Sequence, residues 1–188
     1  QMDRIAYIKF GNDQLEKIGN TVVYLSERIS QLSKTKLLKL LYILDELSVK
    51  KSGIPFVNLT YKVWKFGPVS EELFIDLSSE PTLLTKFINN ENTVITAKKS
   101  FDDSEFSDND IELMNFVIEK YGNKTAKELV AYTHRKNAPW HETAVEKNVL
   151  ELLENEQINN TEYVIDLSRL VMHDPVKNEL YRNYIEVN

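Results

Sequence analysis

Apolar residues recur at helical spacing along most of the chain, and this pattern predicts a mainly α fold. The chain has only 5 Gly and 5 Pro in 188 residues, so few residues interrupt the helices. We expect helices at about residues 12–30, 33–51, 68–77, 81–87, 107–121, 125–137, 139–155, 162–172 and 174–185. For residues 162–172 an alternating pattern is also present, and we favour the helix over a strand.

Two short segments alternate between apolar and polar residues and predict β-strands, around residues 60–66 and 93–96. The length of 188 residues suits one domain with a proper core. We therefore predict a compact, single-domain, mainly α fold over residues 1–188, with a helical C-terminal extension at 156–188.

The predicted helix at 33–51 carries a broad leucine face, with Lys36, Lys39, Glu46 and Lys50 on the opposite face. At 100° per residue, Asp45 falls inside the apolar arc. A buried carboxylate needs hydrogen-bond donors, so we expect Asp45 to bind a Tyr, a Trp or backbone N–H groups. A functional acid at this position is the alternative.

The charge and composition restrict the class of partner. A net charge of −6 disfavours nucleic acid, because phosphate binding depends on Lys and Arg. The absence of Cys excludes disulfides and thiolate metal sites. Residues 1–14 do not resemble a signal peptide, and no apolar run approaches the ~20 residues that span a bilayer. These features predict a cytoplasmic protein without a membrane partner.

The stretch AYTHRKNAPWHE, residues 131–142, holds two of the three histidines and raises the question of a catalytic or metal site. His134 and His141 are separated by Pro139 and do not have a metal-ligand spacing. No phosphate-binding glycine motif occurs. We therefore expect no metal, no cofactor and no catalytic residue, and two alternatives stay open. One is a hydrolase-like enzyme that uses His134 with Asp45 or Glu142; the other is a DNA-binding transcriptional regulator that uses the lysines of 34–51.

A structural interpretation of the same stretch is simpler. His134 lies on the shoulder of the apolar stripe of its helix, where an imidazole is usually hydrogen-bonded to a carbonyl or carboxylate. Asp45 is one candidate to receive that bond. Pro139-Trp140 is expected to form a packed corner in which the indole N–H finds an acceptor.

Four motifs in this order resemble the Panacea domain, a family that includes SocA-like antitoxins and phage-associated proteins. They are Lys39-Leu40-Leu41-Tyr42, the WKFGPV motif that begins at Trp64 and contains Gly67-Pro68, Tyr121-Gly122, and Thr133-His134 followed by Pro139-Trp140. The resemblance spans about residues 15–140. Their combination is far more specific than any one of them.

The resemblance implies a helical, non-enzymatic antitoxin that binds and neutralises a protein toxin, and in one branch of the family delivers the toxin to a protease. The motif residues, together with Asp45, are then expected to specify the fold, and the partner surface is expected elsewhere. Homo-oligomerisation stays open. Our candidates for partner binding are Asp102, Asp103, Asp108 and Asp110 in an acidic run, and Tyr181 and Tyr184 near the C-terminus.

Overall fold

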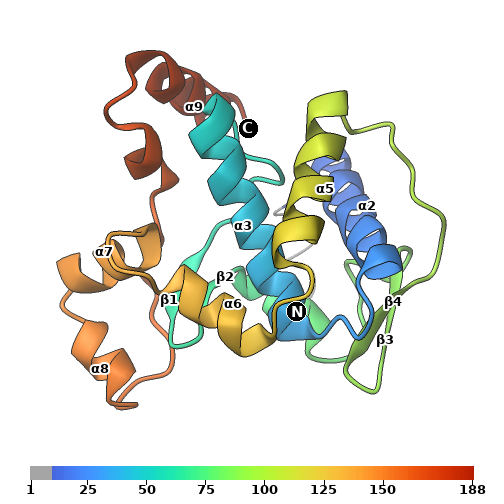
Figure 1. Cartoon of the computed structure of the whole chain (residues 1–188), viewed down its shortest axis with the longest axis horizontal. Helices are drawn as coiled ribbons and strands as arrows, with labels where there is room; N and C mark the ends of the chain where they lie inside the picture. Colours follow the sequence, from blue (N-terminus) through green and yellow to red (C-terminus); the bar gives the residue numbers. More distant parts are fainter. Residues whose placement is uncertain (1–9) are drawn as a thin grey trace. The chain divides into compact units, whose positions relative to one another are not determined.

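The computed structural model describes residues 10–188 and confirms the mainly α fold. Among the described residues there are eight α-helices, one 3₁₀ helix and two β-hairpins (Figure 1). The helices are α2 (Asn12–Arg28), α3 (Lys34–Ser52), α4 (Glu71–Leu77), α5 (Asp108–Tyr121), α6 (Ala126–Thr133), α7 (Pro139–Glu146), α8 (Leu150–Glu154), η1 (Leu167–Val171) and α9 (Pro175–Val187). No helix of this part of the chain has the length and apolar character needed to cross a membrane.

Two compact units can be distinguished in the chain. Of the described residues, the first unit contains 10–38 together with Glu72–Lys124. The second contains Lys39–Glu71 and Thr125–Asn188. Each unit is therefore assembled from two separate stretches of chain.

In the first unit, a β-hairpin packs on α2 (Figure 1). Its strands are β3 (Ile88–Glu91) and β4 (Val94–Ala97), so the predicted strand at 93–96 is confirmed. Gly19 permits this packing, because a Cβ on Gly19 would lie 2.5 Å from the ring of Phe87. Gly19 is therefore a position where α2 leaves room for the ring of Phe87, the residue just before β3.

The helix predicted at 81–87 is absent, and a buried carboxylate explains why. Asp76 accepts hydrogen bonds from the backbone N–H groups of Thr82, Leu83 and Leu84 at 2.8–3.1 Å. The segment therefore turns around the carboxylate instead of continuing as a helix. Pro81 is a helix-start signal, and the hydrogen bonds to Asp76 override it.

In the second unit, Asp45 of α3 accepts hydrogen bonds from four consecutive backbone N–H groups, those of residues 56–59, at 2.7–3.2 Å. The hydroxyl of Tyr61 donates a fifth, at 2.6 Å. Asp45 is fully buried. The expected bonding of this carboxylate to a Tyr and to backbone N–H groups is confirmed.

The segment after Asp45 forms a hairpin of β1 (Lys62–Trp64) and β2 (Gly67–Val69). This confirms a strand within 60–66. It corrects the helix start predicted at Pro68, which lies in β2, so α4 begins at Glu71. A third stretch joins β1: Val63 N–H donates to Tyr163 C=O at 3.0 Å, and Ile165 N–H donates to Tyr61 C=O at 2.8 Å.

The C-terminal part of the second unit is less helical than predicted. Because residues 163–165 pair with β1, only Leu167–Val171 of the segment 162–172 is helical, and the predicted helical extension at 156–188 consists of η1 and α9. The helix predicted at 139–155 is also split into α7 and α8, with Asn148 at φ 56° between them. Asn is among the residues that tolerate this left-handed conformation.

Replacing Asp45 with Asn should strongly destabilise the protein. The amide offers one acceptor oxygen and puts an NH₂ group against backbone donors, so buried N–H groups lose their partners. We expect the free energy of unfolding to fall by about 3 kcal/mol in denaturant titrations. The exposed Asp103→Asn is the matched control, with an expected change within about 0.5 kcal/mol. Equal changes in the two variants would contradict the assigned role of Asp45.

Candidate functional site

The motif residues of the second unit meet at the β1–β2 hairpin. We call Lys39, Trp64, Gly67, His134 and Trp140 the motif cluster. Gly67 has φ of 106°, a conformation that favours glycine. A Cβ at this position would lie 2.6 Å from Thr133 Oγ1 and 3.0 Å from Lys39 Cε. The glycine is therefore required both by the backbone and by the two side chains packed against it.

Lys39 is buried, which contradicts its predicted place on the charged outer face of its helix. Its side chain is 1% exposed, and the ammonium donates a hydrogen bond to the carbonyl of Pro68. Burial lowers the pKa of Lys39 to about 7. Because the charged form is disfavoured by desolvation, a substantial fraction of this amine is neutral near pH 7.

His134 is the C-cap of α6, and its ring stacks on Trp140 with centroids 3.8 Å apart and an interplanar angle of 16°. Its Nε2 is buried and has no hydrogen-bond partner among the described residues, while the imidazole bonds to the backbone of Lys65. The hydrogen bond predicted for this imidazole is therefore present. Its partner is the backbone of Lys65 and not Asp45. Burial, with the nearby charges of Lys39 and His141, lowers the pKa of His134 to about 4.

The two tryptophans connect the hairpin to the rest of the unit. Trp140 is 2% exposed, and its indole N–H donates to the carbonyl of Trp64 at 2.9 Å. The indole N–H of Trp64 donates to Thr161 C=O at 3.2 Å, and the Thr161 hydroxyl donates to Val63 C=O at 2.8 Å. The expected Pro139-Trp140 corner and the acceptor for its indole N–H are both present.

A second buried polar group lies further along α3. Glu46 was placed on the charged outer face by its spacing, and the structure shows it 0% exposed. Its Oε1 accepts a hydrogen bond from Arg135 at 2.9 Å and lies 3.5 Å from the Lys50 ammonium. Lys39, Tyr42 and Glu46 follow one another at spacings of three and four, so they form a row on one helix face. The sequence pattern gave no signal of this burial, because charged residues at helical spacing predict an exposed face.

Two of the groups named in the hydrolase-like alternative, Asp45 and His134, have other partners in the structure. The Asp45 carboxylate is occupied by backbone donors, and His134 is held by Lys65 and Trp140. An imidazole with a pKa near 4 is also poorly matched to proton transfer at neutral pH. Among residues 10–188, no group of three or more His, Asp or Glu side chains is arranged to hold a metal ion.

The lysines of the DNA-binding alternative are largely engaged by the protein. Lys39 is buried, Lys34 donates to the Ser78 hydroxyl at 3.1 Å, and Lys36 donates to the carbonyl of Gly122. Lys50 lies beside Glu46. A row of lysines free to contact phosphates is therefore not presented along this helix.

The residues predicted to bind a partner occupy different surroundings. Asp110 caps α5 and pairs with Lys17 at 3.1 Å, and Asp102 accepts from the backbone N–H of Ser104 at 2.9 Å. Asp103 and Asp108 are exposed in the same unit. In the other unit, Tyr181 and Tyr184 are half-buried on α9. The exposed members of the predicted set are therefore Asp102, Asp103 and Asp108.

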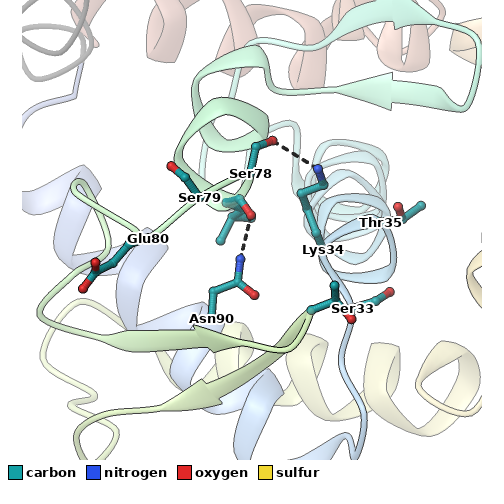
Figure 2. Close-up of a pocket in the computed structure, with 9 residues that line it drawn as sticks. Ser33, Lys34, Thr35, Ser78, Ser79, Glu80 and Asn90 are labelled. Atoms are coloured by element: carbon teal, nitrogen blue, oxygen red, sulfur yellow. Dashed lines mark hydrogen bonds between the residues drawn. The ribbon is translucent and has the colours of Figure 1, made fainter.

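A polar pocket of about 510 Å³ lies in the first unit, where the N-terminal turn of α3 meets the end of α4 and the β3–β4 hairpin (Figure 2). Figure 2 shows Lys34 directed at the Ser78 hydroxyl and the Asn90 amide directed at the Leu77 carbonyl, so these polar groups bind one another. The pocket contains none of the motif residues. Its other lining residues are Ser33, Thr35, Ser79, Glu80 and Thr93.

The comparisons with known proteins agree with the motif assignment. Residues 37–141 match the family model described as antitoxin SocA-like, Panacea domain. This range covers more than half of the chain and includes every residue of the motif cluster. No curated protein and no solved structure gave a match.

The buried amine predicts a pH dependence of stability that depends on Lys39. The folded-state pKa is about 7 and the ordinary value is 10.5, so between these pH values the unfolded chain binds the extra proton. Stability should therefore rise with pH across this window, by roughly 3 kcal/mol for this one group. The Lys39→Met variant should lose that rise in denaturant titrations taken at several pH values. Lys51→Met, at an exposed lysine of the same helix, should keep it; an unchanged pH profile in Lys39→Met would contradict the neutral buried amine.

His134→Ala should lower stability, because it removes both the stack on Trp140 and the bond to Lys65. We expect a loss of about 2 kcal/mol in the free energy of unfolding. His173→Ala, at an exposed histidine, supplies the control and should change stability by less than about 0.5 kcal/mol. If His134→Ala folded with unchanged stability, the structural role of this residue would be wrong.

Proposed function

The chain belongs to the antitoxin SocA-like, Panacea domain family, and from this membership we propose that it is the antitoxin of a toxin–antitoxin pair. In this proposal it acts in the cytoplasm, within a bacterial or prophage module, by binding and neutralising a protein toxin. The observation that carries the proposal is the family match over residues 37–141.

The chemistry of the motif cluster supports a binding role over a catalytic one. Several of its groups bind within the second unit: Lys39 binds Pro68, Trp140 binds Trp64, and Gly67 is packed under both Lys39 and Thr133. A catalytic group has to reach a substrate, whereas these groups hold a hairpin against two helices. The cluster thus suits a scaffold that presents a surface to another protein.

The proposal is tested by co-expression with the product of the neighbouring gene. Expression of that product alone should stop growth, co-expression of this chain should restore growth, and the two proteins should co-purify. A neighbour that is not toxic, combined with no co-purified protein, would remove the proposal. The Asp45→Asn variant is a useful negative control, because a chain that fails to fold should fail to rescue.

The same experiment separates two modes of neutralisation. Direct binding leaves the toxin level unchanged while growth recovers. Delivery to a protease lowers the toxin level, and the decrease disappears when that protease is deleted. Immunoblots of the toxin during rescue therefore distinguish an inhibitor from an adaptor.

A further inference from the structure

The negative charge of the protein is concentrated in one segment. Residues 142–188, which follow the family match, contain ten acidic and four basic side chains, and their net charge of −6 equals that of the whole chain. The preceding 141 residues contain nineteen of each. The family-matched part is therefore electrically balanced, and the segment after it is acidic.

Exposed apolar side chains are concentrated in the same segment. Within residues 10–188, thirteen large apolar side chains are exposed, and nine of them lie after residue 141. Four of these nine are on α9, a helix of 13 residues that has no buried residue. Soluble proteins rarely gather exposed apolar groups on one element without a partner for them.

One side of α9 packs against the rest of the second unit, to which the helix belongs. The Lys177 ammonium donates to the carbonyl of Lys50 at 2.9 Å, and the backbone of Lys177 lies against Gly53, where a Cβ would come within 2.6 Å of the Lys177 carbonyl oxygen. Tyr181 and Tyr184 are half-buried on this side. Burial, with the nearby carboxylates of Asp166 and Asp45, raises the pKa of Tyr181 to about 12. These tyrosines therefore attach the helix to its own unit.

An outward face of α9 lies next to the attached side and carries an apolar strip. Val176 and Leu180 are 69% and 43% exposed, and Val187 is 83% exposed. At 100° per residue these three positions fall within roughly 40° of one another. Glu179 and Glu186, both exposed, border the strip on one side. The outward face of α9 thus combines apolar contacts with an acidic edge.

We propose that this outward face of α9 binds the partner toxin, in a groove with an apolar floor and a basic rim. The inference rests on the proposed antitoxin function and names the surface that performs it. An amphipathic helix places side chains at spacings of four and seven into such a groove, and opposite charges at the rim set its orientation. α9 as a whole is neutral, because Lys177 and Arg182 balance Glu179 and Glu186. The basic rim is assigned to the partner because the two exposed glutamates lie next to the strip, whereas the Lys177 ammonium is bound to Lys50.

The test uses the full chain and the purified product of the neighbouring gene, with affinity measured at low and high salt. The double variant Val176→Lys/Leu180→Lys removes the apolar contacts and should weaken binding by at least about tenfold. The double variant Glu179→Lys/Glu186→Lys should weaken binding by about tenfold at low salt and flatten its salt dependence. Because all four side chains are exposed, Tm should stay within about 2 °C of the unsubstituted protein.

Matched controls come from the first unit. Ile75→Lys changes an apolar residue that is 54% exposed on α4, and Glu112→Lys/Glu119→Lys makes the same change in net charge on α5. Both controls should bind like the unsubstituted chain. Loss of binding in the α9 variants alone would support the proposal.

The other outcomes overturn it in distinguishable ways. If the unsubstituted chain binds and the α9 variants bind equally well, the antitoxin function stands and the assigned surface is wrong. If the unsubstituted chain neither binds nor rescues growth, the proposed function fails and the inference fails with it. If sedimentation shows that the chain dimerises alone and that Val176→Lys/Leu180→Lys abolishes the dimer, a second copy occupies this face and the toxin does not.

Discussion

The fold of the second unit depends on one buried carboxylate. Asp45 binds the backbone N–H groups of residues 56–59 and the hydroxyl of Tyr61, which fixes the path of the chain as it enters β1. Strand β1 then supplies the carbonyl of Trp64 to the indole of Trp140, and the following turn brings Gly67 against Lys39 and Thr133. The contacts that define the family motifs are thus consequences of the loop that Asp45 holds.

Burying the polar groups around this loop costs stability, but it also favours one arrangement of the packed segments over others. Lys39 and Glu46 are both fully buried on α3, and each is removed from water with few partners to replace it. Such groups contribute less to net stability than apolar residues of similar size. They do, however, penalise any arrangement in which their partners are missing. Because Pro68 faces Lys39 and Arg135 faces Glu46, these groups favour one placement of the hairpin and of the end of α6.

Most helices could be predicted from the sequence because their signals are local. The capping residues Ser107 and Thr125 begin α5 and α6 as expected, and the spacing of apolar residues locates α2 and α3. The errors occur where a hydrogen-bond partner outside the segment determines its conformation. Asp76 turns residues 82–84 away from the predicted helix, and β1 draws residues 163–165 into an extended pairing. Neither partner is visible in the local pattern.

The site was predicted less completely than the fold, for a similar reason. Binary patterning assigned Lys39 and Glu46 to solvent because it treats charge as exposed, yet the face that carries them packs inside the unit. By contrast, the Trp140 corner and the bonding of Asp45 followed from the general need of buried polar groups for partners. That need indicates that a bond must form, and it does not indicate with which residue. His134 illustrates this limit: Asp45 was one candidate partner, whereas the imidazole bonds to the backbone of Lys65.

The motif cluster lies in the interior of the second unit, whereas the charged residues of α9 lie at its surface. This separation determines which substitutions the protein tolerates. Substitutions in the motif cluster alter packing and are felt as losses of stability, because Lys39, Gly67 and Trp140 have little room to change. Substitutions on α9 change residues that are in contact with solvent, since none of its residues is buried. A surface that can change without a loss of stability can be adapted to a new partner while the fold is retained. Under the proposed antitoxin function, one scaffold of this kind can bind different toxins when the partner is bound outside the motif cluster.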